Sequence, residues 1–414
     1  MNKKPVAIVL GGTIPHAELL NNLKKRGYYT ILIDYFESPP AVNNADLHIK
    51  ESTLDYNQVL QTAKNYKAKL VISTCIDQAG VSACYVAEKL NLPAPYSYET
   101  ALKVTNKTLM KKIMSEHNLP TSKFCVVSEY NKLNEVSLKL PVVVKPADSN
   151  SSKGVRRADN EAEFRMFLKQ ALQLSRNKKA IVEEFVVGEE IGVDCFIGID
   201  DVHIIMMHRK RKPMKNNKDV LYSIGSISPP EISKTAERKL LEIVKKIASV
   251  FKLKNTPLLL QTIVNGDNVY IIEFSPRIGG GLNFRKIKLF TGFDIIDAAV
   301  DSYLGRPVTP VYTHPDFFFS ENHIYALPGI FSHVEGYKSL LENSVIEEIH
   351  FNKNKGMQLT EDMSSSNRVG SFIVKSDTLD ELRRRIRNAI DMIEVYDVTG
   401  QALMKKGIYL DLLF

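Results

Sequence analysis

Cysteine is scarce in this sequence, and its positions mark neither a metal site nor a disulfide framework. The 414 residues include four cysteines but no C-x-x-C pair, and no matching histidine spacing accompanies them. Zinc sites and small disulfide-rich domains both need recognisable cysteine spacings. The pattern is typical of a protein from a reducing compartment. The four positions are Cys75, Cys84, Cys125 and Cys195.

Long hydrophobic runs are also missing. Residues 1–10 carry two lysines and only a short apolar stretch before Gly11 and Gly12, which is too short for the core of a signal peptide. No apolar run approaches the ~20 residues that a membrane-spanning helix needs. We therefore expect no membrane association and a cytoplasmic location.

The chain lacks a concentrated block of charge, although its formal net charge is +8. Lys and Arg are scattered, and they form dense runs only at residues 208–212, 215–218 and 383–387. Nucleic-acid-binding domains gather basic residues on one face or along one helix, so we expect no nucleic-acid partner. Basic residues that line a cleft would instead attract anionic small molecules such as a nucleoside triphosphate.

The dinucleotide-binding fingerprint G-x-G-x-x-G is absent. The turn after the first expected strand is Gly11-Gly12-Thr13, which lets the backbone approach a ligand at a helix N-terminus. Asp34, at the end of the second expected strand, has the position of a ribose-binding acid in an NAD-dependent oxidoreductase. Without the glycine spacing, a plain strand-end aspartate is the preferred interpretation of Asp34.

What the sequence does contain is an alternation of short apolar runs with amphipathic helical segments. This alternation predicts an α/β domain with a parallel sheet over residues 1–95. Residues 96–305 are expected to form an α+β region in which residues 120–185 make a lid, followed by antiparallel strands, a long helix and a hairpin. Residues 306–414 are expected to form a small C-terminal α+β subdomain with an amphipathic helix at 379–393.

The hairpin expected over residues 257–274 carries three oxygen-bearing side chains. Asn265-Gly266-Asp267 marks its turn. Gln261 and Glu273 can meet across the ladder, and Ser275 lies two residues further on the same face as Glu273. Oxygen ligands suit Mg²⁺, which usually takes one or two carboxylates. The hairpin therefore predicts a magnesium site, with a surface Gln–Glu pair as the alternative.

A glycine-rich segment follows the hairpin directly. After Pro276 and Arg277, the chain reads Ile278-Gly279-Gly280-Gly281. Such a backbone can pass close to a bound group, and the fork-shaped guanidinium of Arg277 can hold a phosphate or carboxylate at two points. The alternative is a glycine turn with an exposed arginine.

A lysine ends the apolar run before a hydroxyl-rich loop. Lys145 follows Val142-Val143-Val144 and precedes a Ser-rich loop that ends at Gly154. A fixed positive charge with many small donors and accessible N–H groups is suited to phosphate. The lysine precedes the loop, so the segment is not a Walker motif. The alternative is a surface lysine beside a polar hairpin.

Acidic residues flank an apolar bend in residues 182–194. A strand edge there can offer backbone N–H and C=O groups to an adenine, and Glu190 lies within reach of ribose hydroxyls. An ordinary acidic connection between strands is the alternative.

The order of these features resembles the ATP-grasp superfamily, in the branch that includes L-amino acid ligases, carbamoyl-phosphate synthases and ribonucleotide transformylases. The resemblance covers residues 5–305. It implies a pre-ATP-grasp domain at residues 1–95 and a two-part ATP-grasp region at residues 96–305. The features that carry it are the parallel-sheet domain, Lys107 in a Thr-Asn-Lys helix start, Lys145 before the Ser/Gly loop, the Glu-Glu-Phe-Val-Val-Gly-Glu-Glu segment, Gln261 and the Glu-Phe-Ser-Pro-Arg segment.

The resemblance also implies a role for each matching residue. The implied ATP contacts are Lys107 and Lys145 at the phosphates, Ser152 and Gly154 in the loop over them, and Glu184, Val186 and Glu190 at the adenosine. The implied ligands of Mg²⁺, or of Mn²⁺ in its place, are Gln261, Glu273 and Ser275, and Arg277 steadies the transferred phosphate or acyl phosphate. Many members have Asn where this chain has Ser275, so a second metal position would be looser, filled through water or missing.

The implied function is an ADP-forming ligase that activates a small carboxylate as an acyl phosphate and transfers it to an amine. Phosphoryl transfer needs charge neutralisation and positioning more than acid–base chemistry, and lysines, magnesium and an arginine supply both. His208 would contact the γ-phosphate or the acceptor, unless it belongs to a solvated basic turn. The alternatives are a formate-using ribonucleotide transformylase of purine synthesis and a non-catalytic ATP-binding regulatory protein. A homodimer is also implied by the resemblance.

Overall fold

The structure is a computed structural model that describes residues 4–130, 137–149, 153–213 and 222–409. The described strands form four sheets, of which the largest has eight strands. Ser152, one of the predicted phosphate-loop residues, lies outside the described residues.

The N-terminal unit is the parallel α/β domain that the alternation of the sequence predicts. Its strand order is β3-β2-β1-β4, and all pairs are parallel. β3 was not expected, because its three residues are only partly buried and show no apolar run. The elements are β1 (Val6–Leu10), α1 (Ile14–Lys25), β2 (Tyr29–Ile33), β3 (Leu47–Ile49), α2 (Tyr56–Asn65), β4 (Leu70–Ile72) and α3 (Asp77–Leu90).

Two short helices then lead into a small antiparallel sheet. Asn106 caps the second helix by accepting a hydrogen bond from the backbone N–H of Leu109, which places Lys107 in the first helical position. The first helix was not expected from the sequence, although Ser97 caps it in the same way. The elements are α4 (Tyr98–Thr105), α5 (Lys107–Glu116), β5 (Phe124–Val127), β6 (Val142–Pro146), β7 (Arg156–Ala158), α6 (Glu161–Leu174) and β8 (Ala180–Glu184).

The central sheet holds the predicted hairpin. Its strand order is β13-β12-β9-β10-β11-β14-β18-β16, with antiparallel pairing throughout. The predicted pairing of Gln261 with Glu273 is confirmed, and a bulge follows it between Gln261 and Thr262. The elements up to α9 are β9 (Glu189–Ile197), β10 (Val202–Arg211), β11 (Gly225–Ser228), α7 (Lys234–Phe251), β12 (Thr256–Asn265), β13 (Asn268–Ser275), α8 (Asn283–Thr291) and α9 (Ile295–Tyr303).

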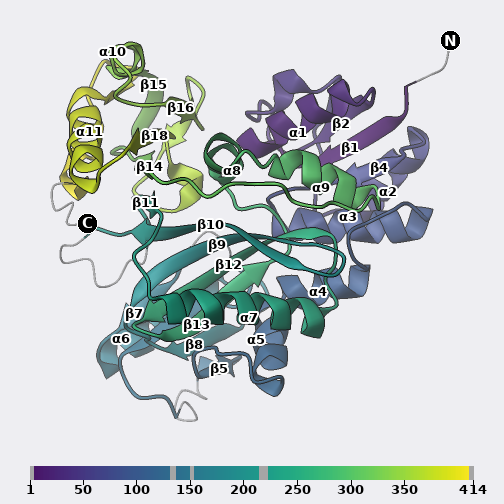
Figure 1. Ribbon diagram of the computed structural model, residues 1–414, viewed down its shortest axis with the longest axis horizontal. Coiled ribbons are helices and arrows are strands. Elements are labelled where there is room, and N and C mark those ends of the chain that lie inside the picture. Colours follow the sequence, from purple (N-terminus) through teal and green to yellow (C-terminus); the bar gives the residue numbers. More distant parts are fainter. Residues whose placement is uncertain (1–3, 131–136, 150–152, 214–221, 410–414) are drawn as a thin grey trace.

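Helices cover both faces of the central sheet. The apolar face of α7 packs under β9, β12 and β13, where Leu240, Val244 and Ile247 are buried. On the other face, α8 and α9 lie between the central sheet and the N-terminal unit (Figure 1). The guanidinium of Arg26 binds Asp297 and Asp301 of α9 at 2.5 and 2.6 Å, which ties the two units together.

The C-terminal region shares the central sheet. β14 pairs with β11, so the sheet continues past residue 306, and the C-terminal elements lie on the same side of it as the N-terminal unit (Figure 1). The mixed α/β and α+β fold class is therefore confirmed. The remaining elements are β14 (Phe318–Ile324), β15 (Gly329–Glu335), α10 (Tyr337–Glu342), β16 (Glu348–Phe351), β17 (Gln358–Leu359), β18 (Gly370–Ser376), α11 (Leu379–Met392) and β19 (Glu394–Asp397).

Across the described ranges, the structure has no helix that is long and apolar enough to cross a membrane.

Two glycines give a matched test of the backbone in this region. Gly188, between β8 and β9, has φ +152°, and an added Cβ would lie 2.5 Å from the carbonyl oxygen of Val264. Gly266 also has positive φ, +57°, but open space surrounds it. We expect Gly188→Ala to destabilise the fold by more than about 2 kcal/mol and Gly266→Ala by about 1 kcal/mol. Thermal unfolding followed by circular dichroism measures both, and equal shifts would contradict the packing described for Gly188.

Candidate active site

A cavity of about 1250 Å³ lies where the N-terminal unit, the predicted lid, the central sheet and the C-terminal strands meet. Typical ligand pockets have volumes of ~300–1,000 Å³, so this cavity has room for a nucleotide and a further substrate. The carboxyl ends of β1, β2 and β4 open into it, which is the edge where parallel sheets usually bind ligands.

Lys145 belongs to a buried group of charges whose central member is Glu183. Glu183 of β8 forms ion pairs with Lys145 Nζ at 2.6 Å and with Lys111 Nζ of α5 at 3.1 Å. Burial alone would raise the pKa of Glu183, but the two lysines outweigh it and lower the pKa to about 2. Burial lowers the pKa of Lys111 to about 8, although Glu183 opposes this shift. We call these three residues the lysine–glutamate triad.

Lys107, the second predicted phosphate lysine, forms an ion pair with Glu273 of β13. Burial would lower the pKa of Lys107, and the charge of Glu273 outweighs it and raises the pKa. In the same way, burial would raise the pKa of Glu273, but Lys107 and Lys145 lower it. Glu273 is therefore ionised and is shared between the predicted phosphate side and the predicted metal side of the cavity.

The predicted magnesium ligands lie at neighbouring positions on the hairpin. Gln261 and Glu273 are direct partners across β12 and β13, and Leu259 is the partner of Ser275. Gln261 Oε1 accepts a hydrogen bond from Lys210 at 3.3 Å. In the part of the chain that the structure describes, no three His, Cys, Asp or Glu side chains gather as a metal site. On the cavity wall, the hairpin supplies one carboxylate and one amide oxygen, hard donors that suit Mg²⁺ when phosphates and water complete the shell.

Arg277 is held in place by an acid that the sequence did not point to. Its Nε and Nη2 donate to Asp77 Oδ1 and Oδ2 at 2.6 and 2.9 Å, and its Nη1 donates to the carbonyl of Ile278 at 2.8 Å. Burial would raise the pKa of Asp77, but the charge of Arg277 lowers it, and Ser275 adds a hydrogen bond. Asp77 opens α3 on the N-terminal unit, so this two-point contact fixes Arg277 against a different part of the fold.

The predicted adenosine residues line the cavity on the lid side. Glu184 and Val186 lie at and after the end of β8, and Glu184 Oε1 accepts the backbone N–H of Lys123 at 3.0 Å. Glu190 of β9 is bound by Lys210 at 2.5 Å and Lys212 at 2.7 Å. Although burial raises the pKa of Glu190, these lysines lower it to about 2.

His208 lies inside strand β10 and is buried, so it does not belong to a solvated turn. Its Nδ1 is 3.4 Å from Asp194 Oδ2, and its ring packs against Gly192, where an added Cβ would lie 2.3 Å from Nε2. Burial lowers the pKa of His208, although Asp194 opposes this. A neutral imidazole is therefore expected at this wall of the cavity.

One cavity thus brings together most of the described residues that the sequence singled out. Gly154 and Ser275 lie outside its wall: Gly154, with φ +74°, packs against Pro146 and Leu174, and Ser275 faces Asp77. The predicted residues that line the cavity are Lys107, Lys145, Glu184, Val186, Glu190, Gln261, Glu273 and Arg277, together with His208.

Residues 138–285 match the family model described as the ATP-grasp domain. The chain therefore contains an ATP-grasp domain. A second model, L-amino acid ligase C-terminal domain 2, matches residues 322–397. The resemblance drawn from the motifs is thereby confirmed, and the second match extends it beyond residue 305.

Known proteins similar to this ATP-grasp chain share about a fifth of its residues. The carbamoyl phosphate synthase large chain of Clostridium acetobutylicum is 22% identical over 317 residues, which are 74% of this chain and 28% of that protein. The formate-dependent phosphoribosylglycinamide formyltransferase of Sulfurisphaera tokodaii is 22% identical over 275 residues, 65% of this chain and 68% of that protein. The chain therefore spans little more than a quarter of the length of the carbamoyl phosphate synthase.

A solved structure shares the fold over almost the whole chain. The L-amino acid ligase from Bacillus licheniformis is 18% identical, with a TM-score of 0.78, and the match covers 96% of this chain and 99% of that one. The phosphoribosylglycinamide synthetase from Anaerococcus prevotii is 22% identical, with a TM-score of 0.73 and coverage of 95% and 100%. These similarities show the fold of the chain. They do not identify its substrates.

Three site residues escaped the sequence argument. Asp77 and Lys111 carry no motif of their own, although Asp77 follows a parallel strand, where sites are common. Glu183 was passed over for its neighbour Glu184, and the alternation of β8 turns the two side chains to opposite faces. Of the two, Glu183 is the residue that contacts Lys111 and Lys145.

The triad gives a prediction for stability and its dependence on pH. Glu183→Gln leaves two buried lysines without an anion, so we expect it to lower stability by about 3 kcal/mol or more near pH 6. Because burial lowers the pKa of Lys111 in the folded chain, the unfolded chain then binds more protons than the folded one, and stability rises with pH. Melting temperatures should therefore show a deficit that shrinks as the pH rises from 6 to 9.

Glu184→Gln is the matched control for that experiment, because its amide oxygen can still accept the N–H of Lys123. We expect a small, pH-independent change from it. In the wild type, the contribution of Glu183 is complete above its ordinary pKa of 4.5 and is lost as the pH falls toward 2. A Glu183→Gln deficit that stays constant with pH would contradict the electrostatic account.

Proposed function

We propose that the chain is an ADP-forming ligase that uses ATP and Mg²⁺ to activate a small carboxylate and join it to an amine. The observation that carries the proposal is the convergence of Lys107, Lys145, Glu273 and Arg277 on one cavity. Two cations, a shared acid and a fork-shaped guanidinium are the groups that phosphoryl transfer to a carboxylate requires. The ATP-grasp match supports this reaction class.

The proposed roles follow from position. Lys107 and Lys145 bind the ATP phosphates, and Glu184, Val186 and Glu190 contact the adenosine. Gln261 and Glu273, with Ser275 beside them on the hairpin, would hold Mg²⁺, and the ion when bound would neutralise charge on the phosphates. Gly154 belongs to the loop over the phosphates. Ser152, assigned to the same loop, stays a prediction outside the described residues.

Arg277 is proposed to bind the donor carboxylate and to stabilise its acyl phosphate. In the first step, a carboxylate oxygen bonds to the γ-phosphorus, the bond from that phosphorus to the bridging oxygen breaks, and ADP leaves. In the second step, the amine nitrogen bonds to the carbonyl carbon, and the bond from carbon to the phosphate oxygen breaks. Inorganic phosphate leaves, and the nitrogen loses its extra proton to solvent or phosphate. Asp77 acts through Arg277 as a positioning residue, because it binds two of its nitrogens.

A formate-using transformylase is the second candidate, because a formyltransferase is among the similar proteins. It would require a ribonucleotide phosphate site on the acceptor side. A homodimer stays a prediction.

The experiment that tests the proposed function traps the acyl phosphate with hydroxylamine, a nucleophile small enough to need no acceptor site. The purified chain, ATP and Mg²⁺ are incubated with aliphatic, hydroxy, dicarboxylic and amino acids, and ADP and hydroxamate are measured. We expect matched ADP and hydroxamate formation with one class of acid. Glu273→Gln should reduce it by about 100-fold or more, because one charge at the metal and Lys107 is lost.

Glu242→Gln is the control for that variant, because Glu242 is exposed on α7 and pairs only with exposed Lys245 among the described residues. Near-normal turnover of Glu273→Gln with an unchanged magnesium requirement would exclude Glu273 as a metal ligand. If ATP binds but no carboxylate yields hydroxamate, the chain is a nucleotide-binding protein without this activity.

A further inference from the structure

The cavity has an apolar end on the N-terminal unit, in the loop that follows β2. Tyr35 and Phe36 of this loop line the cavity, although the two residues are 59% and 52% exposed. Their ring centroids are 4.1 Å apart, so the rings present one continuous surface, which we call the aromatic pair. None of the proposed roles above uses it. Aromatic rings left open in a cavity are suited to an apolar group of a ligand.

The loop holds the aromatic pair in place through contacts of its own. Asp34 Oδ1 accepts the N–H of Phe36 at 2.9 Å, and the N–H of Ala41 donates to the carbonyl of Gly12 at 2.9 Å. Pro39 packs on Gly12, where an added Cβ would lie 2.4 Å from Pro39 Cβ. The carboxylate of Asp34 therefore supports the loop, and the exposure of the aromatic pair is a fixed feature of the cavity.

A loop of the C-terminal region, between β16 and β17, lies against the loop after β2. Asn354 Nδ2 donates to the carbonyl of Ser38 at 3.5 Å, so the two loops touch. Met357 Sδ accepts the backbone N–H of Asn354 at 3.3 Å, and Met357 lines the cavity. A methionine side chain is flexible and adapts to apolar groups of different shapes. Both loops thus add apolar side chains to the cavity.

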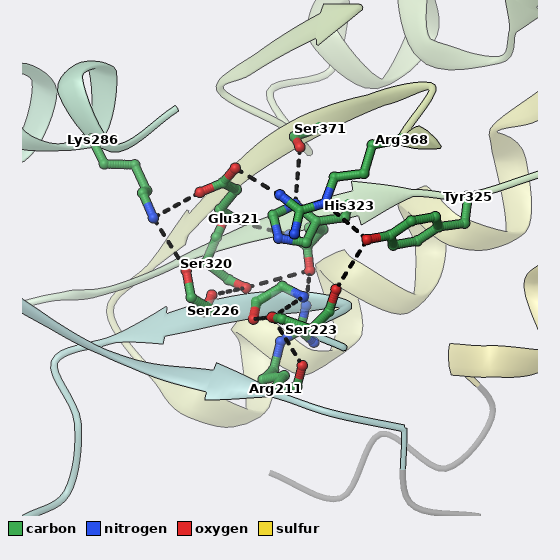
Figure 2. Close-up of polar contacts among 12 residues, drawn as sticks. Arg211, Ser223, Ser226, Lys286, Ser320, Glu321, His323, Tyr325, Arg368 and Ser371 are labelled. Atoms are coloured by element: carbon green, nitrogen blue, oxygen red, sulfur yellow. Dashed lines mark hydrogen bonds and ion pairs between the residues drawn. The ribbon is translucent and has the colours of Figure 1, made fainter. Parts of the chain in front are cut away.

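Charge is distributed unevenly over the cavity wall. Figure 2 shows the charged groups that the C-terminal region contributes, with Glu321 paired with Lys286 and with His323 and Arg368 next to this pair. By contrast, no Lys, Arg or His among the described residues of the N-terminal unit lines the cavity. A phosphate or a second carboxylate would find no cation from that unit, whereas an uncharged apolar group needs none.

The aromatic pair lies two strands away from the proposed position of the donor carboxylate. Arg277 is held by Asp77, which follows β4, whereas the aromatic pair follows β2, and β1 with its Gly12 turn lies between them. Neighbouring strands are ~4.8 Å apart, so the two positions are about 10 Å apart along the edge of the sheet. Ile14 and Ile76 line the cavity along this edge and carry no charge.

We propose that the aromatic pair binds an uncharged, apolar tail of the carboxylate donor, while the carboxylate of the same molecule binds Arg277. The donor is then an elongated acid with an aryl or alkyl group about 10 Å from its carboxylate. A short acid would leave both rings in water. A tail that ends in a carboxylate or phosphate would lose hydration without gaining a cation from the N-terminal unit. The inference rests on the proposed ligase function and names the chemical class of its donor.

The test compares carboxylates that differ only in the tail. The full chain, ATP, Mg²⁺ and hydroxylamine are incubated with acetate, phenylacetate or phenylpentanoate, whose ring is on the terminal carbon. Hexanoate, adipate and aminohexanoate supply alkyl, anionic and cationic tails of similar length. ADP and hydroxamate formation give kcat and KM for each acid. We expect kcat/KM for phenylpentanoate to exceed the values for acetate and adipate by about tenfold or more, because burying the phenyl group stabilises the complex.

Replacing both Tyr35 and Phe36 with Ala should raise the KM for phenylpentanoate by about tenfold or more. The KM values for phenylacetate and for ATP should change by no more than about twofold, because neither ligand reaches the aromatic pair. Phe36→Leu should keep part of the affinity, because leucine still offers apolar surface. Tyr66→Ala is the matched control and should leave every value unchanged, because Tyr66 is 41% exposed on the same unit and lies outside the cavity wall.

Three results would overturn the proposal. One is a wild type that prefers an acid with a short or charged tail to phenylpentanoate and hexanoate. The second is a double Ala variant that raises the KM of phenylacetate and of phenylpentanoate equally. In both cases hydroxamate formation continues, so the ligase function stands and only the donor assignment fails. The third is the absence of hydroxamate with every carboxylate, which removes the ligase function and the role of the aromatic pair with it.

Discussion

Buried positive charge is the constraint on which the rest of this structure depends. A cavity that receives a triphosphate must hold cations away from bulk water, and a buried cation without an anion is strongly destabilising. The chain meets this requirement by pairing cavity cations with acids on the wall. The pairs are Lys145 with Glu183, Lys107 with Glu273, Arg277 with Asp77 and Lys210 with Glu190.

These pairs also position the elements that carry them. Lys107 lies on α5 and Glu273 on β13, whereas Arg277 follows β13 and Asp77 opens α3. Each ion pair therefore ties the hairpin to a different helix, and the predicted metal side of the cavity is held from two directions. Arg368 departs from this pattern, because its described partner is a phenol.

The sequence predicted those features that depend on local order. The hairpin register followed from the Asn265-Gly266-Asp267 turn and from alternation, and it placed Gln261 opposite Glu273. The match to the ATP-grasp domain could also be anticipated, because its motifs follow one another along the chain. The roles given to individual residues stay predictions, although most of those described line one cavity.

What the sequence could not supply are contacts between distant segments. Asp77 and Arg277 are 200 residues apart, and nothing in a single sequence reports that distance in space. Glu321, His323 and Arg368 were missed for a related reason: two of them stand on a strand that has no motif, and the third follows a short turn. These residues reach the cavity only because β14 pairs with β11 and β18.

That pairing bears on how two substrates could be brought together. The hairpin with the predicted metal ligands is one end of the eight-stranded sheet, and β14 lies on the far side of β11 in the same sheet. A hydrogen-bonded sheet covered by helices on both faces holds residues on different strands at a fixed separation. Fixed positions favour a reaction between two bound molecules, because less orientational freedom is lost in the reaction. The predicted lid contains a separate four-stranded sheet, β5-β8-β6-β7, which carries Lys145 and Glu183. This sheet is joined to α5 by the buried ion pair of Glu183 with Lys111, so its position against the cavity is fixed by charge as well as by packing.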